Sequence, residues 1–212
     1  MTRTDDLIAQ LAAEARPVSP AAPRLAAALV GGGLIALLIM MAFFGAPLKA
    51  LPNTGTTALA VKLGFTLALA LIAATACLAA GRPGDRPLRR LIYLVAPLLV
   101  VGSVAAYELL QAPAGGRESL LFGSTYGTCI AAVAGTSLPA LALMVWVFRA
   151  LAPTRLAFAG FLLGLSSGSA AAVAYALYCP EVTASFLLAA YVPAMLISAA
   201  IGALIGPRVL RW

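Results

Sequence analysis

Three cysteines carry the most reactive side chains of this 212-residue sequence, and they stand far apart at Cys77, Cys129 and Cys179. A pair of thiols can form a disulfide in an oxidising compartment or capture a soft metal ion. Cysteines so few and so scattered do not make a disulfide scaffold or a CxxC metal finger. Histidine, the commonest general base and metal ligand, is absent from the sequence. The residue types therefore argue against an enzyme, and no cofactor is predicted.

The elements that position these residues are predicted to be membrane-spanning helices. The chain is 63% hydrophobic and 10% charged, with a mean hydropathy of +1.02, well outside the usual range for a soluble domain. Its apolar residues form runs of roughly 18 to 25, which is the length that a helix needs to cross the hydrocarbon core. Long alternation of polar and apolar residues, as in a membrane barrel, is not found. The predicted fold class is all-α, a polytopic transmembrane bundle.

Two regions are expected, an N-terminal segment over residues 1–24 and a six-helix transmembrane domain over residues 25–212. The second span is short, and an extension back through residues 57–60 would let Lys62 snorkel toward the surface. The first apolar run lacks the basic start and the cleavage site of a signal peptide, so we expect it to stay in the mature protein. The predicted spans are 25–45, 63–80, 91–111, 125–148, 156–178 and 184–206.

The basic residues predict the orientation of the bundle. Of the 14 basic residues, most lie in the N-terminal tail, the second and fourth loops and the C-terminus, whereas Lys49, Lys62 and Arg117 fall on the other side. The positive-inside rule then places both termini in the cytoplasm. The arginines are scattered along membrane edges, which does not favour a direct nucleic-acid partner.

Small residues recur at four-residue spacing in the last two spans, at Gly160, Gly164 and Gly168 and again at Gly202 and Gly206. Such strips let helix backbones approach closely in lipid. We interpret them as packing within the bundle and not as a pore or a dimerisation face. The oligomeric state is not predicted.

The N-terminal segment is predicted to contain a short amphipathic helix followed by a proline-bearing spacer. Asp5 and Asp6 would lie in its first turn, where the helix dipole favours negative charge, and Leu7, Ile8 and Leu11 would share one face. A helix of about ten residues is not stable alone in water, so this face needs a surface to lie on. Either the protein's own cytoplasmic loops or a soluble partner with a groove would provide one; the lack of basic residues disfavours the lipid headgroups.

The predicted topology also places the reactive side chains. Cys129 and Cys179 fall at nearly the same depth below the outer surface, whereas Cys77 falls near the inner side and is interpreted as packing. Glu108 lies near the outer end of the third span. It can be read as a solvated, snorkelling carboxylate or, with the two cysteines, as a weak metal site. The cysteines themselves are either a sensing pair or inert buried residues.

Several short motifs, together with their order and spacing, resemble the NrsF-type membrane anti-sigma factors. These motifs are Thr4-Asp5-Asp6-Leu7-Ile8, Leu11-Ala12, Arg16-Pro17-Val18, Gly123-Ser124, Gly127-Thr128-Cys129, Tyr178-Cys179-Pro180-Glu181 and Leu210-Arg211-Trp212. The resemblance implies six inner-membrane spans and an extracytoplasmic-function sigma factor as partner, contacted by the N-terminal segment. It also implies that Cys129 and Cys179 match a cysteine pair that takes part in sensing stress.

The function expected from the sequence is signal transduction, in which a change at Cys129 and Cys179 releases a sigma factor held by the N-terminal segment. The alternative is a small transporter or channel. That alternative predicts charge at mid-depth in the membrane or broken helices around a central site, and Glu108 is the one charge that the predicted spans contain. A membrane enzyme and a purely structural membrane protein are further alternatives.

Overall fold

The computed structural model describes residues 3–14, 21–47, 51–82, 84–113, 115–151, 153 and 155–211. Within these ranges the chain forms helices joined by short turns and contains no strand, which confirms the all-α prediction. Six helical segments are long and apolar enough to cross a membrane. Of the sequence predictions, the proline-bearing stretch over residues 15–20, Lys49 and Trp212 lie outside the described residues, as does the side chain of Leu11.

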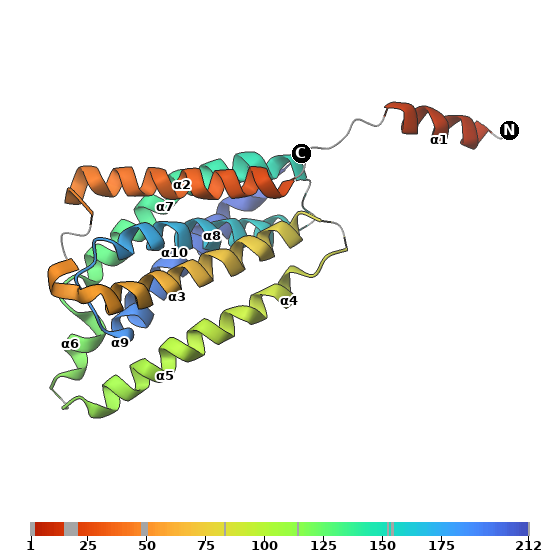
Figure 1. The fold of residues 1–212 in the computed structure, drawn as a ribbon. Helices are drawn as coiled ribbons and strands as arrows, with labels where there is room; N and C mark the ends of the chain where they lie inside the picture. Colours follow the sequence, from red (N-terminus) through yellow and green to blue (C-terminus); the bar gives the residue numbers. More distant parts are fainter. Residues whose placement is uncertain are drawn as a thin grey trace.

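The six segments run side by side, and a short helix precedes them (Figure 1). Helix α1 (Arg3–Glu14) lies away from the bundle, beyond the end at which α2 begins. The segments able to span a membrane are Ala21–Phe44, Gly55–Ala80, Pro87–Gln111, Arg117–Leu151, Leu156–Ala176 and Ala184–Val209.

Three of the six segments are built from more than one helical piece. Helix α2 (Ala21–Phe44) and helix α8 (Leu156–Ala176) are uninterrupted, and α3 (Leu51–Ala80) bends at Gly55. The third segment joins α4 (Pro87–Leu91), a 3₁₀ turn (Ile92–Leu94) and α5 (Val95–Gln111). The fourth joins α6 (Arg117–Phe122), α7 (Tyr126–Phe148) and a 3₁₀ turn (Arg149–Leu151). The sixth joins α9 (Ala184–Phe186), a π-helical turn (Leu187–Tyr191) and α10 (Val192–Val209).

The main difference from the predicted spans concerns the second one. The sequence places its start at residue 63, whereas the apolar helix runs from Gly55. Gly55 adopts φ 75° and ψ 156°, a conformation that favours glycine and ends the regular helix there. Lys62 therefore lies within the helix, as in the extended form of the prediction, but its side chain is buried.

Side-chain polarity is arranged as expected for a protein that faces lipid. Large apolar side chains are exposed on the outside, such as Phe43 at 82%, Leu110 at 78% and Trp146 at 73%. Small polar residues are buried instead, and their hydroxyls are satisfied by carbonyl groups of the preceding turn, as in Ser166 to Leu162 and Ser169 to Leu165. In lipid the apolar exterior costs nothing, whereas each buried hydroxyl needs such a partner.

Helix α8 occupies the centre of the bundle and packs closely on α10. A Cβ atom added at Gly160 would collide with the carbonyl oxygen of Gly202, and one added at Gly164 would lie 2.8 Å from the Cα of Ala199. The glycine strips of the last two spans therefore face each other. Their predicted role in packing within the bundle is confirmed.

Candidate functional site at the cysteine end

The two ends of the bundle differ in chemistry. We call the end that holds Cys129 and Cys179 the cysteine end, and the opposite end, with the loop 82–90 and with Arg155 and Arg208, the arginine end. In Figure 1 the start of α2 and the C-terminus lie together at the arginine end, and α6 and α9 lie at the other.

Cys129 and Cys179 come together as predicted. Cys129 lies in the first turn of α7, and Cys179 follows α8. Both are free thiols, 0% and 2% exposed, in one cluster of buried side chains that also contains Tyr175 and Tyr191. Cys77 belongs to a different buried cluster, with Leu25 and Met144 among its members. The prediction that Cys77 is a packing residue agrees with that position.

Lys62 contradicts the sequence analysis. Its side chain does not snorkel to the surface, because it is 1% exposed and its ammonium group donates a 2.8 Å hydrogen bond to the carbonyl oxygen of Cys179. Cys129 and Glu181 lie close enough to interact with it electrostatically. Burying an ammonium group is expensive in free energy, so Lys62 is itself a candidate functional residue of this site.

The same observation alters the comparison with a transporter. The predicted spans held Glu108 as their one charge, and Lys62 is a second. At 1% exposure, however, Lys62 is enclosed by protein. Its bond to the carbonyl group of Cys179 joins α3 to the turn that follows α8.

Aromatic side chains surround the thiols. The ring of Tyr175 lies between those of Phe44 and Tyr191, with centroid distances of 6.4 and 5.9 Å. Tyr191 is completely buried, and its hydroxyl finds no hydrogen-bond partner of good geometry although the Cys179 thiol lies beside it. The Cys179 thiol is therefore the nearest polar group for this buried hydroxyl.

Glu108 also differs from its prediction as a solvated carboxylate. Its two oxygens accept hydrogen bonds from the backbone N–H groups of Ala184 and Ser185, at 3.0 and 2.9 Å, and from the Ser185 hydroxyl at 2.9 Å. These N–H groups open α9, so the carboxylate satisfies the free donors of a helix start and faces its positive dipole end. Glu108 thereby joins the third span to the sixth.

Glu181 makes a similar contact that the sequence analysis did not foresee. One carboxylate oxygen accepts bonds from the backbone N–H and the hydroxyl of Ser124, at 2.8 and 2.9 Å. Gly123 precedes this turn with φ 49°, and an added Cβ atom would lie 2.6 Å from the Glu181 carboxyl carbon. Two of the motifs that carry the family resemblance therefore contact each other in the folded chain. They are Gly123-Ser124 and Cys179-Pro180-Glu181.

The weak metal site suggested for Cys129, Cys179 and Glu108 is not formed. Within the described ranges there is no group of three or more Cys, His, Asp or Glu side chains placed to hold an ion. Glu108 is engaged with the start of α9, and the ammonium group of Lys62 beside the thiols opposes a further cation.

Helix α1 lies where the sequence predicts the short N-terminal helix. It covers twelve residues with Asp5 and Asp6 in its first turn. Leu7 is 55% and Ile8 is 59% exposed, so these two apolar side chains are not covered by the bundle.

Six apolar helices whose large apolar side chains also face outward are those of a multi-pass α-helical membrane protein. The chain belongs to the family described as negative regulator of sigma F, NrsF, whose model matches residues 11–212. The probable anti-sigma-F factor NrsF of Azospira oryzae is 38% identical over 216 residues, covering 99% of this chain and all of the relative. The anti-sigma-F factor NrsF of Caulobacter vibrioides is 36% identical over 217 residues, with the same coverage. No solved structure matches the chain.

Proposed function

We propose that this protein is an anti-sigma factor of the bacterial inner membrane that sequesters an extracytoplasmic-function sigma factor through its cytoplasmic N-terminal segment. The family and the two curated anti-sigma-F relatives support this class of function. The observation that carries the binding site is the exposed apolar face of α1 at Leu7 and Ile8. A helix of twelve residues gains stability when such a face enters a groove on a partner.

The proposed contact surface comprises Asp5, Asp6, Leu7, Ile8 and Leu11. Helical spacing puts Leu11 one turn beyond Leu7, on the same face. The acidic side chains of the first turn favour helix formation and add a polar rim to the apolar contact. This arrangement requires α1 to be on the cytoplasmic side of the membrane, where the positive-inside rule also puts the arginine end.

The test is a pair of matched double variants in the full-length protein. Leu7→Ser with Ile8→Ser removes the apolar face, whereas Ala9→Ser with Ala13→Ser changes the opposite face of the same helix. We expect the first pair to abolish co-purification of a sigma factor, identified by mass spectrometry, and to raise transcription from its promoters. The second pair should behave as wild type. Equal binding by both pairs would remove α1 from the proposal.

The stress signal is proposed to act at Cys129 and Cys179. Oxidation would join the two sulfur atoms, with two electrons and two protons passing to the oxidant. The new disulfide would alter the packing between α7 and the end of α8. Coupling to α1 requires that one bundle arrangement be stabilised over another by this change.

The matching control for this step is the third cysteine, which is also buried. Cys129→Ser with Cys179→Ser should retain sigma repression but lose the increase in sigma-dependent transcription that oxidants cause. Cys77→Ser should keep the full response, because Cys77 packs in the other cluster. A response that persists without Cys129 and Cys179 would end their proposed role.

A further inference from the structure

The arginine end contains a pocket of about 840 Å³ that the proposed sigma-binding and sensing roles do not use. It lies where the second span ends at Ala80, the third begins at Pro87 and the fifth begins at Leu156. Three span ends at one level place the pocket at the boundary between hydrocarbon and water. Its volume lies within the range of pockets that hold small ligands.

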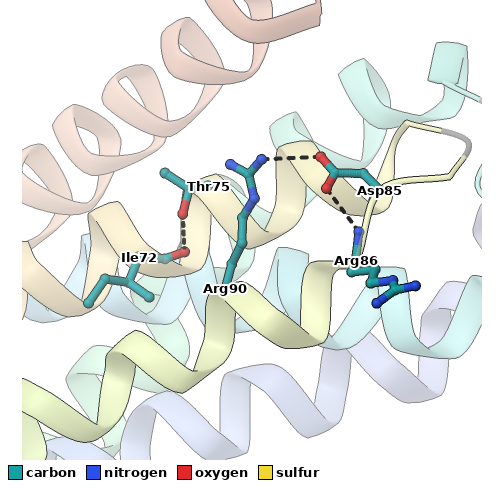
Figure 2. Close-up of polar contacts among 5 residues, drawn as sticks. All are labelled: Ile72, Thr75, Asp85, Arg86 and Arg90. Carbon is teal, nitrogen blue, oxygen red and sulfur yellow. Dashed lines mark hydrogen bonds and ion pairs between the residues drawn. The ribbon is translucent and has the colours of Figure 1, made fainter.

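Four arginine side chains line this pocket, and a single acid accompanies them: Arg82, Arg86, Arg89, Arg155 and Asp85. Asp85 is already engaged, since its carboxylate accepts bonds from the backbone N–H of Arg86 at 2.9 Å and from the guanidinium of Arg90 at 3.1 Å (Figure 2). Figure 2 also shows the side chain of Arg86 pointing away from that carboxylate.

The four lining guanidinium groups have no partner in the part of the chain that the structure describes. The ion pair found there is Arg90 with Asp85, and the arginines that bond carbonyl groups are Arg149 and Arg208. A concentration of unpaired guanidinium groups around one pocket favours an anion with several acceptor oxygens.

The remaining wall of the pocket is apolar. Leu88 and Ile92 are 71% and 65% exposed, and Phe158 joins them from α8. These side chains continue onto the outer surface of α4 and α5. A water-soluble anion would leave this wall uncovered, whereas an acyl chain would cover it.

We propose that this pocket binds an anionic phospholipid, with the phosphate between the arginines and an acyl chain along Leu88, Ile92 and Phe158. The ligand matches the pocket in charge and in having both a polar and an apolar part. It also matches in depth, because phosphate groups lie at this boundary of a bilayer. The proposal stands independently of sigma-factor binding. Its structural consequence is that a bound lipid joins the end of the second span to the start of the third.

Native mass spectrometry of the full-length protein in detergent tests this directly. Phosphatidylglycerol is added to the wild type and to the double variant R86Q/R89Q, with phosphatidylcholine as the zwitterionic comparison. We expect the wild type to prefer phosphatidylglycerol and the variant to lose affinity for it by about tenfold or more. Thermal unfolding in detergent without added lipid should be the same for both proteins, because the two exposed side chains have no partners to lose.

The matched control is R24Q/R211Q, which removes the same charge from exposed arginines outside the pocket. It should keep the affinity for phosphatidylglycerol. Equal losses in both double variants would show general attraction to the arginine end and would overturn the pocket as a site. Binding of glycerol 3-phosphate as tight as that of phosphatidylglycerol would overturn the lipid in favour of a free anion, and unchanged lipid binding in R86Q/R89Q would overturn both.

Discussion

Charged side chains at the cysteine end connect segments that are distant in sequence. Lys62 reaches Cys179 across 117 positions, and Glu108 reaches Ser185 across 77. In each case the charged group bonds the backbone at the start or end of a helix, where unpaired N–H and carbonyl groups are available. A charge buried beside such groups costs less than one buried in hydrocarbon, so the fold can retain it.

Substitutions at Lys62 should separate a buried ammonium group from a snorkelling one. Lys62→Met removes one hydrogen bond but also removes the cost of a buried charge, so we expect stability within about 1 kcal/mol of wild type. Lys62→Glu would set a carboxylate against the Cys179 carbonyl oxygen, and we expect a loss of at least about 3 kcal/mol. The measurement is thermal unfolding in detergent. A Lys62→Glu protein as stable as wild type would mean that the side chain reaches water.

At the scale of helices, α8 and α10 can pack closely because glycines, which have no side chain, stand at their contact. The carbonyl oxygen of Ser198 and the Cα of Ala199 occupy the space that a side chain at Gly164 would need. Gly164→Leu should therefore force the two helices apart and cost about 2 kcal/mol or more. Gly135→Leu in α7 is the control, since a Cβ atom there has open space around it, and it should leave the unfolding temperature nearly unchanged.

The measurement is the unfolding temperature in detergent of Gly164→Leu, Gly135→Leu and the wild type. If Gly164→Leu and Gly135→Leu shifted stability equally, the close approach of α8 and α10 would not be a feature of the folded protein. Loss of folded protein in the first variant alone would support the approach.

Periodicity and composition determine the helices of this protein well, but they do not determine its polar contacts. The six spans are visible in the sequence because each apolar run has the length of a bilayer crossing. The sequence alone predicts Lys62 at the surface, because it gives no carbonyl partner for the ammonium group. It predicts a solvated Glu108, because the free N–H groups of α9 belong to another span. The meeting of Ser124 with Glu181 is likewise a property of the folded chain, with Gly123 as its one local signal.

At the scale of the whole molecule, the two ends present different chemical groups. The cysteine end contains buried thiols, a buried ammonium group and a tyrosine hydroxyl without a good partner. The arginine end carries exposed guanidinium groups and the attachment of α1. Since α7 and α8 run between the two ends, a repacking around Cys129 and Cys179 has a direct route to the side on which α1 lies.

The proposed function requires the arginine end to face the cytoplasm. Reporter fusions can establish this orientation. Burial of Lys62 strengthens the expected charge asymmetry, because it leaves Lys49 and Arg117 as the basic residues assigned to the cysteine side. We therefore expect green fluorescent protein fused after Trp212 to fluoresce and alkaline phosphatase fused there to be inactive. Alkaline phosphatase inserted between Gly115 and Gly116, at the cysteine end, should be active. The same insertion between Gly84 and Asp85 is the control for the arginine end and should be inactive; the reverse pattern would put α1 outside the cytoplasm and beyond the reach of any sigma factor.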